Sequence, residues 1–373
     1  MKGRRLLMIP GPIEFEPEVM KAVATPTTSH VAPDFIESFG HALEMMREVW
    51  LSPSGQPFIM AGSGTLAMDM AGANLVEPGD RVLVISSGYF GERYAELLRR
   101  YGAEVKVLQA PAGEVVSPET VEAELKQLHF KLMTFTHVDT STAVRVDPRP
   151  LGALGEKYGV ITVLDGVCSV AGEEIRQDEW KIDVVLTASQ KAVGVPPGLA
   201  LMVVSPRAME AWKTRKSPVG SYYSDWTHWL PVMRAYEERR PAYFGTPAVN
   251  LVSGLEVSLR MILQEGMEAR FRRHRERGED FRKAMRNLGL RMIPVSDEVS
   301  ANTLSAPFYP EGVKGSDFMK AIASSDVILA GGLLPAIKDS YFRVGHMGSV
   351  TQGDILATVA AITNALSACG YRK

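Results

Sequence analysis

The sequence contains few of the residues that hold small secreted or metal-bound folds together. Its 373 residues include only two cysteines, Cys168 and Cys369, which are too few for a disulfide framework or a four-ligand zinc site. No apolar run is long enough to span a membrane, and the apolar part of the opening MKGRRLLMIPGP is too short for a signal peptide. A formal charge of −2 gives no reason to expect nucleic acid or an anionic membrane as a partner. We therefore expect a cytoplasmic globular protein that binds no metal.

Apolar strand patterns alternate with helical patterns through the first two thirds of the chain. The strand candidates are Arg81–Gly88, Glu104–Ala110, Lys131–Val138, Val160–Gly166, Val184–Ser189 and Leu199–Ser205. Near-continuous apolar strands separated by helices are typical of a mainly parallel sheet with helices on both faces. One helix is predicted to begin after Ser117, because Ser-Pro-Glu supplies an N-cap, a first-turn proline and an acid near the positive end of the helix dipole.

After about residue 255 the pattern changes to a long charge-rich helix, shorter strand-like pieces and a final helix. We expect a large domain over residues 1–255, with an N-terminal arm to about residue 15, and a smaller α+β domain over residues 256–373. The basic cluster Arg270–Arg277 is interleaved with acids. We interpret it as a solvated helix face and not as a nucleic-acid contact.

The stretch LTASQKAVGVPPG, Leu186–Gly198, places a single lysine, Lys191, directly after an apolar strand. A lysine at a strand end most often belongs to the solvated surface. The alternative is a lysine whose amine attacks a carbonyl to form a Schiff base. Because open parallel sheets bind ligands at the carboxyl ends of their strands, the residues at the other strand ends bear on this choice.

Those strand ends carry small and polar residues of complementary kinds. The segment GSGT, Gly62–Thr65, stands before an apolar helix, where glycines let backbone amides approach an anion. A cluster of hydroxyls, with a carboxylate, follows at Asp139–Thr142, Asp165 ends the next strand, and Gln190 and Lys191 follow the one after. Together these groups match the needs of pyridoxal phosphate: an amine for the aldehyde, a carboxylate for the ring nitrogen and donors for the phosphate.

The chain resembles the class V aminotransferases, specifically the serine–pyruvate and alanine–glyoxylate aminotransferase group. The resemblance covers nearly the whole chain and is carried by PGP at Pro10–Pro12, GSGT at Gly62–Thr65, THVDTSTA at Thr136–Ala143, DGVCS at Asp165–Ser169, SQKA and PPG within Ser189–Gly198, YFGTPAV at Tyr243–Val249 and FRVGHMG at Phe342–Gly348. It implies the fold-type I architecture of PLP-dependent transferases and a homodimer with shared active sites.

The resemblance also implies roles for individual residues. Lys191 would form the Schiff base, and Asp165 would pair with the ring nitrogen. The other residues expected to hold the cofactor within one subunit are Ser63, Gly64, Thr65, Phe90, Thr140, Val167 and Gln190. Tyr243 and Thr246 are expected to reach the phosphate of the neighbouring subunit. Arg343, with Gly11, is expected to bind the substrate, since a guanidinium fork matches an α-carboxylate.

Two positions depart from the pattern of many relatives. Thr65 stands where a histidine is common, and Phe90 stands where tryptophan is frequent, although a phosphate donor and a flat ring are kept. Cys168 is interpreted as a small buried residue beside the cofactor.

The implied activity is transfer of the amino group of alanine or serine to glyoxylate or pyruvate by a ping-pong mechanism. A 2-aminoethylphosphonate-type transaminase is the near alternative, because it shares most of the cofactor residues. A cysteine desulfurase-like lyase is a further alternative. Such an enzyme usually has histidine before the Schiff-base lysine and a reactive cysteine on a mobile loop near the end of the chain. Here Gln190 precedes Lys191, and Cys369 lies in the last helical pattern. A non-catalytic regulator would need an added module, and no segment is left over for one.

Overall fold

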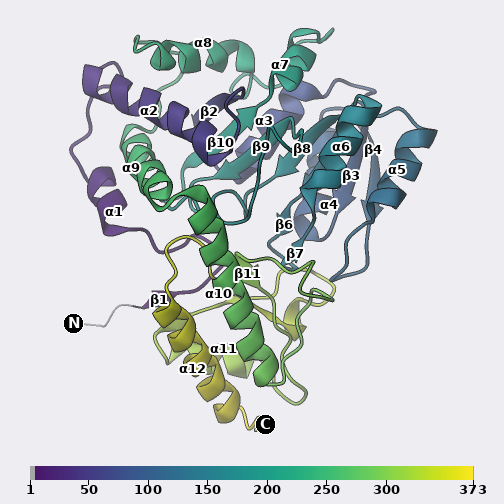
Figure 1. The fold of residues 1–373 in the computed structure, drawn as a ribbon, viewed down its shortest axis with the longest axis vertical. Helices are drawn as coiled ribbons and strands as arrows, with labels where there is room; N and C mark the ends of the chain where they lie inside the picture. Colours follow the sequence, from purple (N-terminus) through teal and green to yellow (C-terminus); the bar gives the residue numbers. More distant parts are fainter. Residues whose placement is uncertain (1–4, 373) are drawn as a thin grey trace.

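The computed structural model describes residues 5–372, and its largest element is a seven-stranded sheet flanked by helices (Figure 1). In spatial order its strands are β2 (Gln56–Ala61), β10 (Leu199–Val204), β9 (Val184–Ala188), β8 (Ile161–Asp165), β5 (Leu132–Thr136), β3 (Arg81–Ser86) and β4 (Glu104–Gln109). Only β10 is antiparallel to its neighbours, and the other pairs are parallel. The predicted mainly parallel sheet is confirmed, and β2 is a strand that the sequence patterns did not predict.

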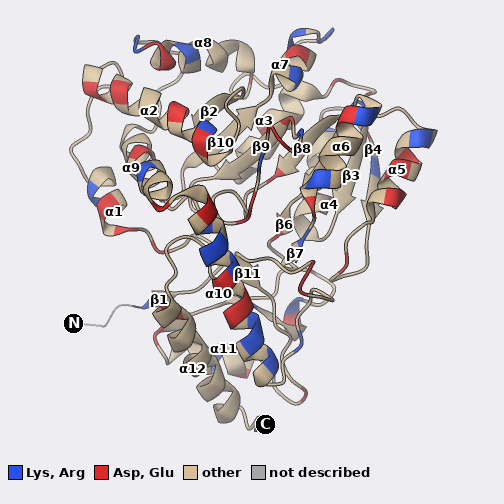
Figure 2. Cartoon of the chain, in the orientation of Figure 1, with Lys and Arg blue, Asp and Glu red and all other residues tan. Residues whose placement is uncertain are grey.

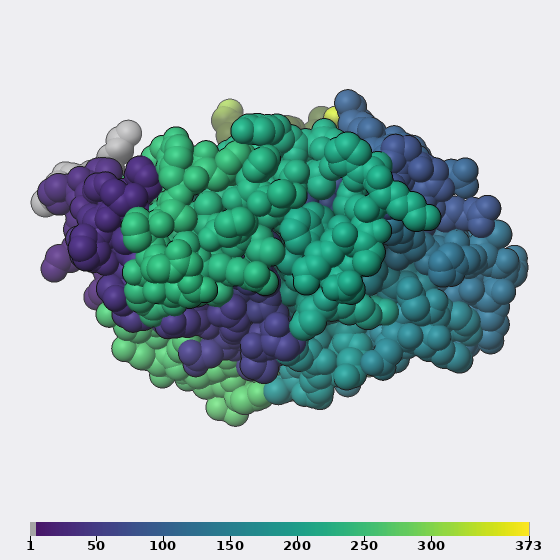
Figure 3. All heavy atoms as spheres, turned by 90° about the horizontal axis from the view of Figure 1, so that it is seen from above, coloured from purple at the N-terminus to yellow at the C-terminus, as the bar shows by residue number. Residues whose placement is uncertain are grey.

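The helices of the first two thirds connect and cover these strands (Figure 1). They are α1 (Pro17–Val23), α2 (Pro33–Val49), α3 (Gly64–Leu75), α4 (Tyr89–Arg100), α5 (Pro118–Gln127), α6 (Pro148–Tyr158), α7 (Pro206–Lys213), α8 (Trp226–Glu237) and α9 (Val249–Glu265). The predicted start of α5 is confirmed, because the Ser117 hydroxyl accepts a hydrogen bond from the Thr120 N–H. Seen from above in Figure 3, the purple amino-terminal helices lie beside the green residues of α8 and α9, against which α2 packs.

The last third forms a second layer of structure below the sheet in Figure 1. Its elements are α10 (Met267–Asn287), β11 (Leu304–Ser305), α11 (Gly315–Ala323), β12 (Val327–Ile328), β13 (Ala330–Gly331), the short 3-10 helix Lys338–Ser340, β14 (Phe342–Gly345) and α12 (Gln352–Ala368). The amino-terminal strand β1 (Leu6–Leu7) pairs in parallel with β12. The hairpin of β6 (Val138–Asp139) and β7 (Val144–Arg145) lies between this part and the sheet.

Three clusters of buried apolar side chains support this arrangement. The largest joins the seven-stranded sheet to its helices, and the second joins α10, α11, α12 and β14. The third lies between them and includes Val138, Cys168, Ala192 and Tyr341, from both parts of the chain. Helix α9 continues through residue 255, and its apolar face lies in the largest cluster. The predicted boundary between a large and a small domain at residue 255 stays a prediction.

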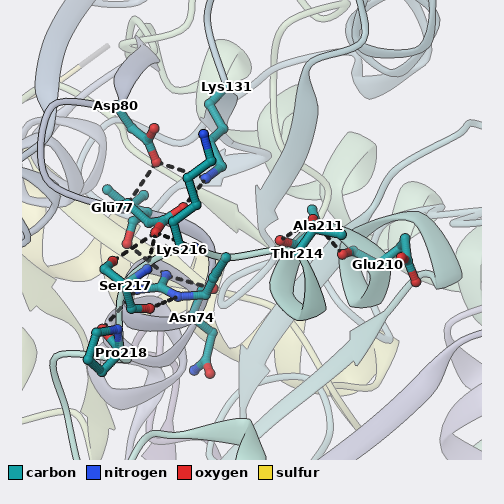
Figure 4. Close-up of polar contacts among 12 residues, drawn as sticks. Asn74, Glu77, Asp80, Lys131, Glu210, Ala211, Thr214, Lys216, Ser217 and Pro218 are labelled. Carbon is teal, nitrogen blue, oxygen red and sulfur yellow. Dashed lines mark hydrogen bonds and ion pairs between the residues drawn. The ribbon is translucent and has the colours of Figure 1, made fainter.

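A charged cluster fixes the carboxyl end of α3. The Glu77 carboxylate accepts hydrogen bonds from Lys131 Nζ at 3.0 Å and from the Ser217 N–H at 2.7 Å, as Figure 4 shows. Burial alone would raise the pKa of Glu77, but hydrogen bonds from Lys131, Ser217 and Lys216 lower it to about 2. Arg215 adds hydrogen bonds to three carbonyl oxygens at the carboxyl end of α3. These contacts hold α3 in place, with its amino-terminal end at the carboxyl edge of the sheet.

Within residues 5–372, no helix has the length and apolar character needed to cross a membrane.

Candidate active site

A cavity of about 170 Å³ lies at the carboxyl ends of the central strands. The strand register places polar groups side by side there, since Thr136 at the end of β5 is directly opposite Asp165 at the end of β8. The predicted site residues that line the cavity are Ser63, Gly64, Thr65, Phe90, Thr140, Asp165, Val167, Gln190 and Lys191. Segments that are far apart in the sequence therefore meet at the carboxyl edge of the sheet, as the sequence patterns predicted.

Lys191 stands in a tight turn after β9 and is only 9% exposed. Ser189 builds this turn, because its hydroxyl donates to the Pro196 carbonyl at 2.8 Å and accepts from the Leu199 N–H at 3.1 Å. Lys191 lines the cavity, and its amine donates a hydrogen bond to the Pro10 carbonyl. Lys191 is therefore not a solvated surface lysine.

Asp165 is the buried carboxylate of the cavity. Its Oδ1 accepts a hydrogen bond from the Val167 N–H at 3.0 Å, which forms the turn after β8. Burial, together with the nearby Asp139 carboxyl, raises the pKa of Asp165 to about 6, although the Val167 N–H, the Lys191 amine and the Thr136 hydroxyl act in the opposite direction. A carboxyl that is held in this way will favour a cationic hydrogen-bond donor, such as a protonated ring nitrogen.

The amino-terminal end of α3 forms another wall of the cavity. Ser63 is its N-cap residue, and its side chain makes no capping hydrogen bond within the described chain. A Cβ atom at Gly64 would lie 2.7 Å from Cγ2 of Val167, so this close approach requires glycine. The helix dipole and free backbone N–H groups of such an end favour an anion.

Phe90, at the start of α4, is held over the cavity by a second buried carboxylate. The Phe90 N–H donates to Asp139 Oδ2 at 3.0 Å, and the Ser141 hydroxyl donates to Asp139 Oδ1 at 2.6 Å. The pKa of Asp139 is raised by burial, although these hydrogen bonds act in the opposite direction. On the same hairpin, the Thr140 hydroxyl donates to Cys168 Sγ at 2.9 Å.

Arg343 and Gly11 lie at the border of the cavity and not in its lining. Arg343 Nη1 donates to the Thr140 carbonyl at 3.2 Å, and its Nε donates to the Gly331 carbonyl at 2.8 Å. Burial lowers the pKa of Arg343. Gly11 has a φ of +100°, and a Cβ atom there would lie 2.6 Å from Cδ of Lys191, so the segment can pass the lysine only as glycine.

Tyr243 and Thr246 do not reach the cavity of their own subunit. Both are exposed on the segment before α9, and Tyr243 is 65% exposed with its ring 5.3 Å from that of His30. The structure therefore does not bring these two residues together with the other predicted site residues.

Several groups at the site were not assigned a role from the sequence. Thr136, Met68 and Val138 line the cavity, and Asp139 supports Phe90. Thr136 and Asp139 belong to THVDTSTA and could have been found from their places at a strand end. Met68 gives no such signal, because a methionine within an apolar helix is typical of a core position. The interpretation of Cys168 as a small buried residue is confirmed, since it is 1% exposed.

The interpretation of Arg270–Arg277 as a solvated helix face holds for Arg272 and Arg275, which are exposed, and was wrong for Arg270. Figure 2 shows both signs of charge along α10, but Arg270 is only 7% exposed and His274 is fully buried. Arg270 donates to the carbonyls of Ala171 and Ala192, each at 2.7 Å, and pairs with Glu265. The reason is that the first half of α10 packs against the loops that follow Asp165 and Lys191, whose carbonyl groups require donors.

Comparison with known proteins places this geometry in a family. The family model described as aminotransferase class-V matches residues 17–347. The chain is 39% identical over 356 residues to alanine–glyoxylate aminotransferase 1 of Saccharomyces cerevisiae, covering 92% of this chain and 91% of that protein. It is 29% identical to serine–glyoxylate aminotransferase of Arabidopsis thaliana, covering 99% and 92%. The crystal structure of an alanine–glyoxylate aminotransferase from Nostoc sp. matches with a TM-score of 0.92 at 30% identity, covering 98% of this chain and 96% of that one.

These matches confirm the resemblance that the motifs carried. The family model spans most of the described chain, and the yeast relative is similar across nearly all of it. The chain therefore belongs to the class V aminotransferases.

Proposed function

We propose that this aminotransferase uses pyridoxal 5′-phosphate to move the amino group of alanine or serine to glyoxylate or pyruvate. The observation that carries the proposal is that the Lys191 amine, the Asp165 carboxyl and the amino-terminal end of α3 meet in one cavity. The family membership implies the cofactor, and the relatives named for alanine–glyoxylate and serine–glyoxylate transfer support the substrate class.

The residues of the cavity fit this cofactor. Gln190 Oε1 is buried and has no hydrogen-bond partner among residues 5–372, although Gln190 lines the cavity. Buried polar atoms normally have partners, so this oxygen supports a polar ligand at this position. Ser63, Gly64, Thr65 and Gln190 would hold its phosphate, and Asp165 would hold its ring nitrogen. When bound, the cofactor supplies an electron sink for negative charge at the α-carbon of the substrate.

The protein residues then orient the substrate and move its protons. Arg343 has donors beyond those used by Gly331 and Thr140, and these would bind the α-carboxylate as a planar fork. The Lys191 amine is the base that removes the proton from the α-carbon and later returns a proton. Asp165 keeps the ring nitrogen protonated. Because one site would serve the donor and then the acceptor, we expect ping-pong kinetics.

The exposed positions of Tyr243 and Thr246 support a homodimer in which each subunit completes the phosphate site of the other. Exposed aromatic and polar side chains on one segment, here Tyr243 and Thr246, are suited to an interface. The cytoplasmic location remains part of the proposal, and fractionation of cells would test it.

A panel of amino donors and acceptors tests the substrate half of the proposal. Alanine, serine, aspartate and 2-aminoethylphosphonate are each combined with glyoxylate and with pyruvate, and kcat/KM is measured. We expect the two small neutral amino acids to have the highest values. Highest efficiency for 2-aminoethylphosphonate would replace the substrate assignment with the phosphonate-type alternative. No transamination with any pair would overturn the proposal.

A further inference from the structure

Arg93 lies next to the amino-terminal end of α3 and has an unusual set of contacts. Its Nη2 donates a hydrogen bond to Thr65 Oγ1 at 2.9 Å. Within residues 5–372 this is the sole side-chain hydrogen bond of Arg93, and no carboxylate there forms an ion pair with its guanidinium. A guanidinium has five N–H donors, so this contact at the protein surface leaves donors of Arg93 that no described protein group uses.

The position of Arg93 follows from the helix that also carries Phe90. The two residues are three apart on α4, so they lie on the same face of that helix. Phe90 lines the cavity, and Arg93 extends from the same face to the first turn of α3. The Asp139 carboxylate fixes the start of α4 by accepting the Phe90 N–H. One anchored helix therefore places an aromatic ring in the lining of the cavity and a guanidinium against Thr65, another residue of that lining.

The hydrogen bond also determines what Thr65 can do. A hydroxyl has one hydrogen and two acceptor positions. Because Thr65 Oγ1 accepts from Arg93, its own hydrogen is free to point elsewhere, and Thr65 lines the cavity. The guanidinium polarises this hydroxyl and makes it a stronger donor toward an anion.

The described lining of the cavity offers no other cation to balance an anion at the amino-terminal end of α3. Among the described residues that line it, Lys191 is the only cationic side chain, and its amine lies at the Pro10 carbonyl. The groups at the end of α3, from Ser63, Gly64 and Thr65, are neutral. A phosphate held there would carry its charge against backbone N–H groups and hydroxyls alone.

We propose that Arg93 is a positioning residue for the phosphate of the cofactor: it holds Thr65 as a donor and supplies the positive charge at that end of the site. This inference rests on the proposed function, because it needs the cavity to bind pyridoxal phosphate. In the sequence, Arg93 looks like any solvated arginine on a helix face, and this proposal gives it a role.

The test compares two ligands that differ only in the phosphate. Cofactor-free protein is titrated with pyridoxal phosphate and with pyridoxal, and the dissociation constants are read from the change in absorbance. Arg93→Gln should weaken pyridoxal phosphate about 10- to 100-fold, the usual effect of a hydrogen bond with a charged group. Binding of pyridoxal should change by less than about twofold. Arg99→Gln, which removes the same charge from the last turn of α4, is the matched control and should change neither constant.

Two further variants separate the role of Thr65 from that of the charge. Arg93→Lys keeps the charge and a donor, so it should recover most of the loss. Thr65→Val removes the hydroxyl, and the effect of Arg93→Gln should be smaller in that background, because the two residues act on the same contact. Thermal unfolding of each variant shows whether the fold is kept.

The outcomes distinguish this inference from the proposed function. Equal affinity of wild type and Arg93→Gln for pyridoxal phosphate would overturn the inference and leave the proposed function intact. Equal weakening of both ligands would also overturn it, because the arginine would then act on the fold and not on the phosphate. A wild-type protein that binds neither ligand would overturn the proposed function and the inference with it.

Discussion

The buried carboxyl of Asp165 makes the stability of the cofactor-free protein depend on pH. Burial raises its pKa from 3.8 to about 6, with the Asp139 carboxyl acting in the same direction and the Lys191 amine in the other. The folded chain therefore binds this proton more tightly than the unfolded chain does. Stability that comes from the proton is complete below about pH 4 and is lost as the pH rises through 6.

The size of the effect follows from the shift. A difference of about two pKa units corresponds to about 3 kcal/mol of unfolding free energy between pH 4 and pH 7.5. Asp165→Asn removes the charge but keeps an oxygen that accepts the Val167 N–H. We expect the cofactor-free Asn variant to exceed the wild type in stability by up to about 3 kcal/mol at pH 7.5 and by little at pH 4. Its activity should be lost, because the ring nitrogen would no longer have an anionic partner.

Urea unfolding of both cofactor-free proteins between pH 4 and pH 8 measures this difference. Asp34→Asn is the control, because Asp34 is exposed at the start of α2 and its replacement should cost less than about 1 kcal/mol. If the wild type is as stable as Asp165→Asn at pH 7.5, or if the gap does not grow with pH, then the argument from burial is wrong.

Four other expectations follow from the site and its supports. The Lys191→Ala variant should fold but show no turnover in assays of the purified protein. Activity near that of the wild type would exclude Lys191 as the base. Arg343→Ala should cost about 2–5 kcal/mol of substrate binding, which lowers kcat/KM for alanine and serine roughly 30- to several-thousand-fold. Arg343→Lys should recover little of this kcat/KM, because a point charge does not reproduce the planar fork, and unchanged kinetics in the alanine variant would contradict the role of Arg343. Mixing Lys191→Ala with a Tyr243/Thr246 double variant should restore some activity in heterodimers, and demonstrated heterodimers without activity would count against shared sites. Glu77→Gln should lower the unfolding free energy by about 1–3 kcal/mol at pH 7. This difference from the wild type should narrow as the pH falls below 4.5 toward 2, where the depressed pKa of Glu77 lies, and a difference independent of pH would refute the stabilising role of the Glu77 carboxylate.

The strands of the sheet could be predicted where burial on both faces makes the sequence almost continuously apolar. This holds for β3, β5, β8, β9 and β10. Strand β2 was missed because its short run contains Pro57 at the edge of the sheet. Its pairing with β10 joins Gln56 to Val204, a contact that no local pattern encodes.

At the site, the sequence predicted the residues that follow strand ends, because parallel strands bring those ends to one edge. Phe90 was found only through the resemblance, and Asp139 received no role although it anchors Phe90. Arg270 and Arg93 could not be recognised, since a charged residue on a helix looks the same whether it faces solvent, a loop carbonyl or a neighbouring helix end. Tertiary packing decides among these, and it is not visible in local sequence.

The most direct test of the account is to find where the cofactor is attached. The purified holoprotein is reduced with borohydride and digested, and the peptides are analysed by mass spectrometry. We predict a phosphopyridoxyl group on Lys191, the lysine whose amine lies in the cavity with Asp165 and the amino-terminal end of α3. A phosphopyridoxyl group on any other lysine, or none in a protein that transaminates, would contradict the account.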